Sequence, residues 1–150
     1  MTLEQKIMQD LKTAMLTKDE KTVRSLRAIK AAIIIAKTAE GAGGEIKEEE
    51  EVKILQKLVK QRKDSLEIYN QQKRADLAIK EEEEIAVIEK FLPQQLTQEE
   101  LSEAIAKIIS ETGASSITEM GKIIGLANKQ LAGRAEGKTI SSTVKMLLSH

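Results

Sequence analysis

The residues with the most evident chemistry lie near the C-terminus, where basic side chains collect beside glycines. Between Gly121 and His150 the chain has five basic residues and one acidic residue, Glu136. The basic residues are Lys122, Lys129, Arg134, Lys138 and Lys145. The whole protein has 24 basic and 24 acidic residues, so this excess is local. Cations beside backbone that glycine leaves accessible are typical of an anion-facing surface.

The turn at 133–138 is the strongest candidate for contact with an anion. Gly133 and Gly137 permit a positive φ, so we expect both to shape a chain reversal. A helix expected to begin near Thr139 would direct unsatisfied N–H groups at this turn, and such groups attract anions. A helix-ending glycine followed by an ordinary surface turn explains the same residues, so both interpretations stay open.

Most side chains that carry enzyme chemistry are absent or poorly placed. There is no Cys, and the single His is the terminal His150, so Ser-His-Asp and Cys-His arrangements lack a well-placed base. No glycine-rich nucleotide-binding motif occurs. The Glu runs point in different directions around a helix, whereas paired carboxylate chemistry needs convergent groups. We therefore expect no catalytic residues, no metal site and no cofactor.

Composition is typical of a soluble, helix-rich protein. Charged residues make up 32% of the chain, and Pro occurs once. No apolar run approaches the roughly 20 residues that cross a bilayer, so we expect no membrane contact. The absence of Cys is compatible with a reducing cytoplasm, where we expect the protein. One Tyr, one Phe and no Trp leave no stacking platform for single-stranded bases.

Helical periodicity predicts four helices before Pro93, and no segment has a convincing strand period. A Thr2–Gln5 capping box precedes the first helix, whose apolar stripe recurs every four residues from Leu3 to Met15. The helices are expected at 3–16, after an Asp19 cap, at 45–72 and at 75–92. On the second helix, ion pairs explain the basic stripe of Arg24, Arg27 and Lys30 as readily as ligand binding does.

Three shorter helices are expected after Pro93. Capping boxes at Thr97 and Ser116 begin the first two, and Thr139 is expected to cap the third. Gly113 and Gly133 end the first two. The sequence therefore predicts an all-α protein with a helical N-terminal domain at 1–92 and a three-helix C-terminal bundle at 93–150.

Several stretches together identify a family resemblance. They are RAIKAAI at 27–33, LVKQRKDS at 58–65, EKFLPQQL at 89–96, Gly121-Lys122 and GRAEGK at 133–138. Jointly they resemble the YqeY family, which shares its fold with the tail domain of the GatB component of the tRNA-dependent amidotransferase. The resemblance covers nearly the whole chain. One departure is Glu136, where the family turn commonly has Asp, a stronger turn former.

The resemblance implies a C-terminal domain that helps to hold tRNA without performing amide chemistry. Descriptions of the family often inherit a carbon–nitrogen ligase activity with glutamine as amido-N-donor, but the glutaminase and kinase portions have no counterpart in this chain. We therefore expect a non-catalytic tRNA-binding accessory. Amidotransferase or aminoacyl-tRNA synthetase components are its candidate protein partners.

The expected RNA site joins the glycines of the turn to the basic residues around it. Gly133 and Gly137 would shape the turn, and the basic side chains would contact phosphates without reading sequence. These side chains are Lys122, Lys129, Arg134, Lys138 and Lys145. The alternative is a protein-interaction adaptor without RNA binding, which a fully paired set of these basic residues would favour. Zero net charge counts against tight RNA binding by this chain alone.

Overall fold

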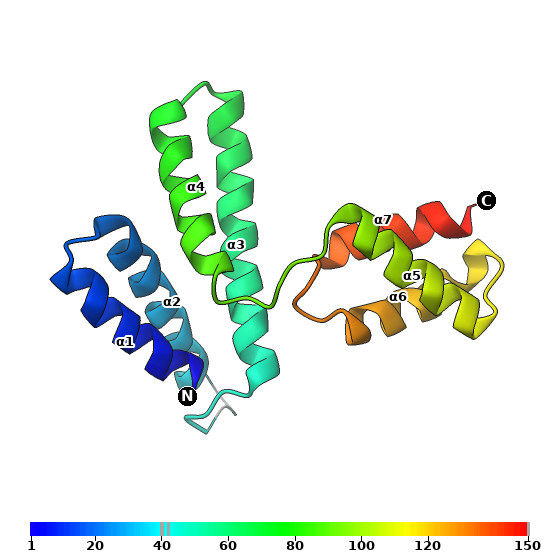
Figure 1. Cartoon of the computed structure of the whole chain (residues 1–150), viewed down its shortest axis with the longest axis horizontal. Helices are drawn as coiled ribbons and strands as arrows, with labels where there is room; N and C mark the ends of the chain where they lie inside the picture. The colour runs from blue at the N-terminus through cyan, green and yellow to red at the C-terminus, as the bar shows by residue number, and fades with distance from the viewer. Residues whose placement is uncertain (40, 42, 150) are drawn as a thin grey trace. The chain divides into compact units, whose positions relative to one another are not determined.

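The computed structural model describes residues 1–39, 41 and 43–149, and the regular structure in these residues is entirely helical. In these residues seven α-helices and one turn of 3-10 helix follow one another (Figure 1). They are α1 (Leu3–Leu16), α2 (Glu20–Thr38), α3 (Glu48–Gln71), α4 (Ala75–Glu89), α5 (Gln98–Thr112), η1 (Ile117–Glu119), α6 (Met120–Gln130) and α7 (Gly137–Leu148). The all-α prediction is confirmed. No helix in the described part of the chain combines the length and apolarity needed to span a membrane.

Side-chain caps determine where several helices begin. Thr2 accepts a hydrogen bond from the backbone N–H of Gln5 at 3.2 Å, and the Gln5 side chain accepts one from the Thr2 N–H at 2.9 Å. Thr97 and Glu100 form the same reciprocal pair at 3.2 and 3.1 Å. Asp19 caps α2 through its carboxylate. Each bond satisfies an N–H that the helix itself leaves without a partner, and these predicted caps are confirmed.

Several predicted helix ends are wrong by one to three residues. α3 begins at Glu48 instead of 45, because Ile46 packs against the core before the helix starts. α4 ends at Glu89 instead of Leu92, since residues 90–92 form tighter bonds to the carbonyls three residues back. The Ser116 capping box opens the short η1 turn, and α6 follows from Met120.

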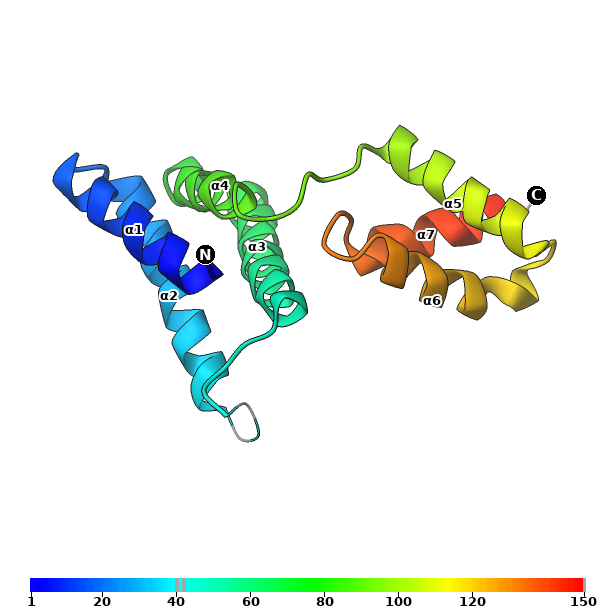
Figure 2. The same cartoon turned by 60° about the horizontal axis from the view of Figure 1, so that its bottom comes forward.

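The helices fall into two compact units, Met1–Leu92 and Pro93–His150. In the first unit α1 lies beside α2 and α3 lies beside α4, as the two views agree (Figures 1 and 2). Its fully buried side chains include Ile7, Leu26, Ile29, Leu55 and Ile88. In the second unit α5, α6 and α7 enclose a separate aliphatic core. Its fully buried side chains include Leu101, Ile105, Ile123, Ile140 and Val144.

Ion pairs connect α2, α3 and α4 within the first unit. Arg24 of α2 and Arg62 of α3 approach the same carboxylate, that of Glu84 on α4, at 3.7 and 3.6 Å. Arg24 also contacts Glu83 of α4 at 3.2 Å. The ion-pair interpretation of the basic stripe on α2 is therefore confirmed for Arg24.

The two separate cores predict that each unit loses its structure independently. Ile29 and Ile105 are both 0% exposed, one in each core, so replacing either by Ala should cost about 2–5 kcal/mol. With Ile29→Ala, hydrogen exchange measured by mass spectrometry should accelerate in peptides from residues 1–92 and stay unchanged in 93–149. Ile105→Ala should produce the reverse pattern. Faster exchange in both units from either change would contradict independent folding.

Two glycines provide a matched test of backbone conformation in the second unit. A Cβ added at Gly113 or Gly125 meets no atom within 4 Å, but Gly113 has a φ of 72° and Gly125 is helical. Gly125→Ala should therefore raise the free energy of unfolding by roughly 0.5–1 kcal/mol. Gly113→Ala should lower it by about 1–2 kcal/mol, since an L side chain is strained at that φ. Urea titration measures both changes in the free energy of unfolding. Changes in the same direction would contradict the difference in backbone conformation between the two glycines.

Candidate nucleic-acid interface

The predicted basic residues lie on α6, on α7 and in the turn between them. Lys122 and Lys129 are seven residues apart on α6, and Lys138 and Lys145 have the same spacing on α7. Seven residues are nearly two helical turns, so each pair shares one side of its helix, with about 10 Å between its members along the axis. All four lysines are exposed. Each helix therefore presents a stripe of two cations.

None of these four lysines forms an ion pair within the described part of the chain. No acidic side chain among the described residues lies within ion-pair distance of any of them. On α5, by contrast, Lys107 approaches Glu111 at 4.0 Å. The set of basic residues is therefore not the fully paired one that would favour an adaptor.

Two acids of the second unit are committed to helix caps. Hydrogen bonds from the backbone and side chain of Thr97 lower the pKa of Glu100, with a smaller attraction from Arg134. Backbone N–H bonds from Ser115 and Ser116 lower the pKa of Glu119, and Lys122 contributes least. Both carboxylates are therefore ionised at neutral pH and accept hydrogen bonds from backbone N–H groups.

Gly133 adopts the left-handed conformation that the turn was expected to need. Its φ is 79°, and the N–H of Arg134 then donates to the carbonyl of Leu131 at 2.9 Å. A residue with a Cβ would be strained there. The predicted role of Gly133 in the chain reversal is confirmed.

The predicted role of Gly137 in the reversal is wrong. Gly137 is the first residue of α7 and lies outside the left-handed region, and the carbonyl of Glu136 accepts the N–H of Ile140 at 3.0 Å. The helix therefore begins before Thr139, which does not cap it. Gly133 alone provides the reversal, so nothing requires a second left-handed residue. Glu136 places negative charge at the helix N-terminus, where the dipole favours it, which makes this end less receptive to another anion.

Arg134 has a structural role that the sequence did not reveal. Its Nε donates to the carbonyl of Gln94 at 3.2 Å, and its own carbonyl accepts the N–H of Leu96 at 2.9 Å. The side chain of Gln95 donates to the carbonyl of Gly133 at 2.6 Å. These bonds, here called the 94–134 clasp, attach the segment after Pro93 to the turn. The bond to Gln94 uses only the Nε of the Arg134 guanidinium.

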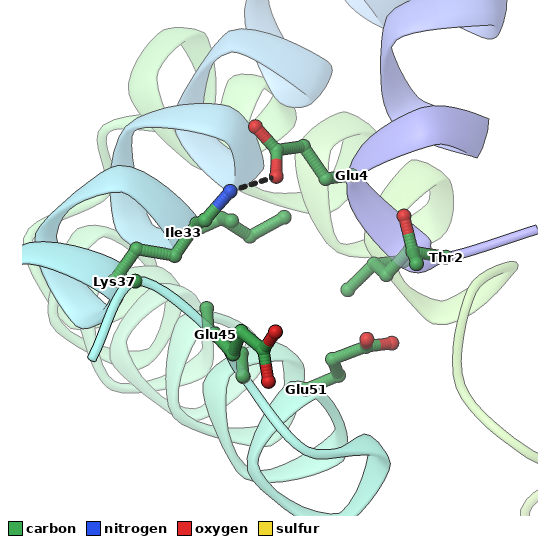
Figure 3. A pocket seen from close by; sticks show the side chains of 9 residues that line it. Thr2, Glu4, Ile33, Lys37, Glu45 and Glu51 are labelled. Carbon is green, nitrogen blue, oxygen red and sulfur yellow. Dashed lines mark hydrogen bonds and ion pairs between the residues drawn. The ribbon is translucent and has the colours of Figure 1, made fainter. Parts of the chain in front are cut away.

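A second candidate lies where the ends of α1, α2 and α3 meet, in a hollow of about 330 Å³ (Figure 3). Glu4 and Lys37 neutralise each other across it at 2.6 Å, and burial raises the pKa of Glu51. The hydroxyl of Thr2 is used in its capping box. No metal-binding cluster of three acidic, His or Cys side chains occurs among the described residues, and His150 lies outside them. Lys37 is paired with Glu4 and the Thr2 hydroxyl caps α1, so the basic stripes remain the better candidate.

Comparison with known proteins agrees with the resemblance seen in the sequence. A family model described as "Yqey-like protein" matches residues 4–148, a range that includes all the predicted site residues. The chain is also 36% identical over 126 residues to "Altered inheritance of mitochondria protein 41, mitochondrial" of Clavispora lusitaniae. That alignment covers 82% of this chain and 72% of the relative. The chain belongs to the YqeY-like family.

Proposed function

We propose that this protein is a non-catalytic RNA-binding accessory and that tRNA is its first candidate ligand. One observation carries the proposal: the four exposed lysines of α6 and α7 form no ion pair with any described residue. Leaving four like charges unpaired on one small unit brings no stability to the fold. A polyanion would neutralise them and release counterions.

The kind of RNA follows from the side chains beside these lysines. The only aromatic residues, Tyr69 and Phe91, precede Pro93, so the second unit offers no ring for base stacking. Recognition through phosphates suits a helical stem, which proteins recognise by shape and backbone contacts. The surface would therefore position a folded RNA without reading its bases.

The resemblance to the tail domain of the amidotransferase GatB component supports tRNA over other folded RNAs. It also supports amidotransferase or aminoacyl-tRNA synthetase components as protein partners, and the proposed location is the cytoplasm. In such an assembly the ligase chemistry would belong to the partner. This chain would contribute affinity and orientation. Since the charges of the whole chain cancel, we expect modest affinity that falls with added salt.

Paired lysine substitutions test the surface directly. We expect about tenfold weaker tRNA binding at low salt from each of two double changes, Lys138→Ala/Lys145→Ala and Lys122→Ala/Lys129→Ala. The reason is that each exposed lysine–phosphate contact contributes less than about 1 kcal/mol to the binding free energy. Each double change should also reduce the slope of log K against log[salt] by about 1.5–2, because two phosphate contacts are lost. Fluorescence anisotropy with labelled tRNA at several salt concentrations measures both quantities.

The control for this test is Lys53→Ala/Lys60→Ala on α3. These lysines are also exposed, seven residues apart and without an ion pair among the described residues. Arg134→Ala is a poor test, because it would also open the 94–134 clasp. An equal loss of affinity in the α3 control would contradict the assigned surface. Absence of binding by the unaltered protein at low salt would refute the RNA proposal.

A further inference from the structure

The first unit has a row of exposed apolar side chains on α1. Met8, Met15 and Leu16 are 49%, 54% and 77% exposed, respectively. Together with Leu11 and Lys12 they line a shallow hollow of about 440 Å³. Single exposed apolar residues are ordinary, but a contiguous group bordering a hollow is typical of an interaction site.

Helical geometry indicates which side of the neighbouring α2 lies next to this row. On α1, Glu4, Met8 and Met15 share one side because four and seven residues return to the same face. On α2, positions 27, 30, 34 and 37 share one side for the same reason. The ion pair between Glu4 and Lys37 joins the two sides at one end (Figure 3). Since α1 and α2 are antiparallel neighbours, these side chains follow a common edge, here called the α1–α2 edge.

The α1–α2 edge combines apolar and cationic groups. Ile34 is 47% exposed on it. Lys12, Arg27 and Lys30 have no ion pair among the described residues, whereas Arg24 is engaged by acids of α4. Lys37, at one end of the edge, is neutralised by Glu4, whereas Lys12, Arg27 and Lys30 remain available to an acidic ligand.

We propose that the α1–α2 edge binds an acidic amphipathic helix of another protein. The seven-residue separation of Met8 and Met15 matches the repeat of an apolar helical stripe. Methionine side chains adapt to varied apolar partners. The adjacent Lys12, Arg27 and Lys30 select acidic residues beside that stripe through charge complementarity. RNA would gain nothing from the methionines and Ile34, which favours a protein ligand.

This proposal is independent of the RNA proposal, which rests on the second unit. The probe is a designed peptide of about 20 residues, long enough to be helical, with a leucine stripe and Glu on its flanks. A matched peptide carries Lys in place of each Glu. The Glu peptide should bind the full chain at least tenfold more tightly than the Lys peptide in anisotropy titrations.

Methyl-labelled methionine locates the bound peptide by NMR. The chain has five methionines, and Met146 of α7 is 49% exposed, the same fraction as Met8. Met8 and Met15 should shift on adding the Glu peptide, while Met146 serves as the internal control. Arg27→Glu/Lys30→Glu should weaken the Glu peptide at least tenfold and strengthen the Lys peptide. Lys53→Glu/Lys60→Glu is the matched charge reversal and should change neither binding by more than twofold.

Several results would overturn the proposal. Equal affinity for the two peptides would show that the edge does not select acidic ligands. Shifts at Met8 and Met15 no larger than the shift at Met146 would show that the peptide does not bind at the α1–α2 edge. Shifts of Met8 and Met15 on concentrating the protein alone would assign the edge to a second copy of this chain. Shifts of the same two methyls on adding tRNA would assign it to nucleic acid.

Discussion

Aliphatic packing without aromatic rings is the constraint on which the rest of this structure depends. Both cores are built from Ile, Leu, Val and Ala, with Phe91 only partly buried at the margin of the first. Branched aliphatic side chains fill a narrow space between neighbouring helices, so each helix buries one stripe. Its remaining sides must be stabilised by caps, ion pairs or solvent. Much of the helical surface is consequently left for charge and for contacts with other molecules.

The distribution of charge divides that surface into neutralised and open regions. Arg24 and Arg62 share Glu84 within the first unit, and the carboxylates of Glu100 and Glu119 accept backbone hydrogen bonds at helix caps in the second. The charged side chains that are not engaged in this way differ in their surroundings between the two units. The lysines of α6 and α7 lie on helices whose large apolar residues are mostly turned inward, which suits a polyanion. The cations of α1 and α2 lie among exposed methionine and isoleucine, which suits a protein helix.

Local features of the fold were predictable because local interactions determine them. The Thr2 and Thr97 caps depend on side chains three residues apart, and Gly113 and Gly133 have the left-handed φ that ends a helix. Gly137 was misjudged because a helix start and a turn tolerate glycine equally well. The link from Arg134 to Gln94 joins positions forty residues apart, which no periodicity encodes.

The apolar repeat of α1 did not predict which of its side chains are exposed. Met15 continues the four-residue repeat from Leu3, yet it is 54% exposed while Ala14 is buried.

The 94–134 clasp has a practical consequence for isolating the C-terminal helices. Although α5 begins at Gln98, the backbone that seals the α6–α7 turn comes from Gln94 to Leu96. A fragment that begins at Gln98 would lack the residues that form the 94–134 clasp with Gly133 and Arg134. A fragment beginning at Pro93 would keep it.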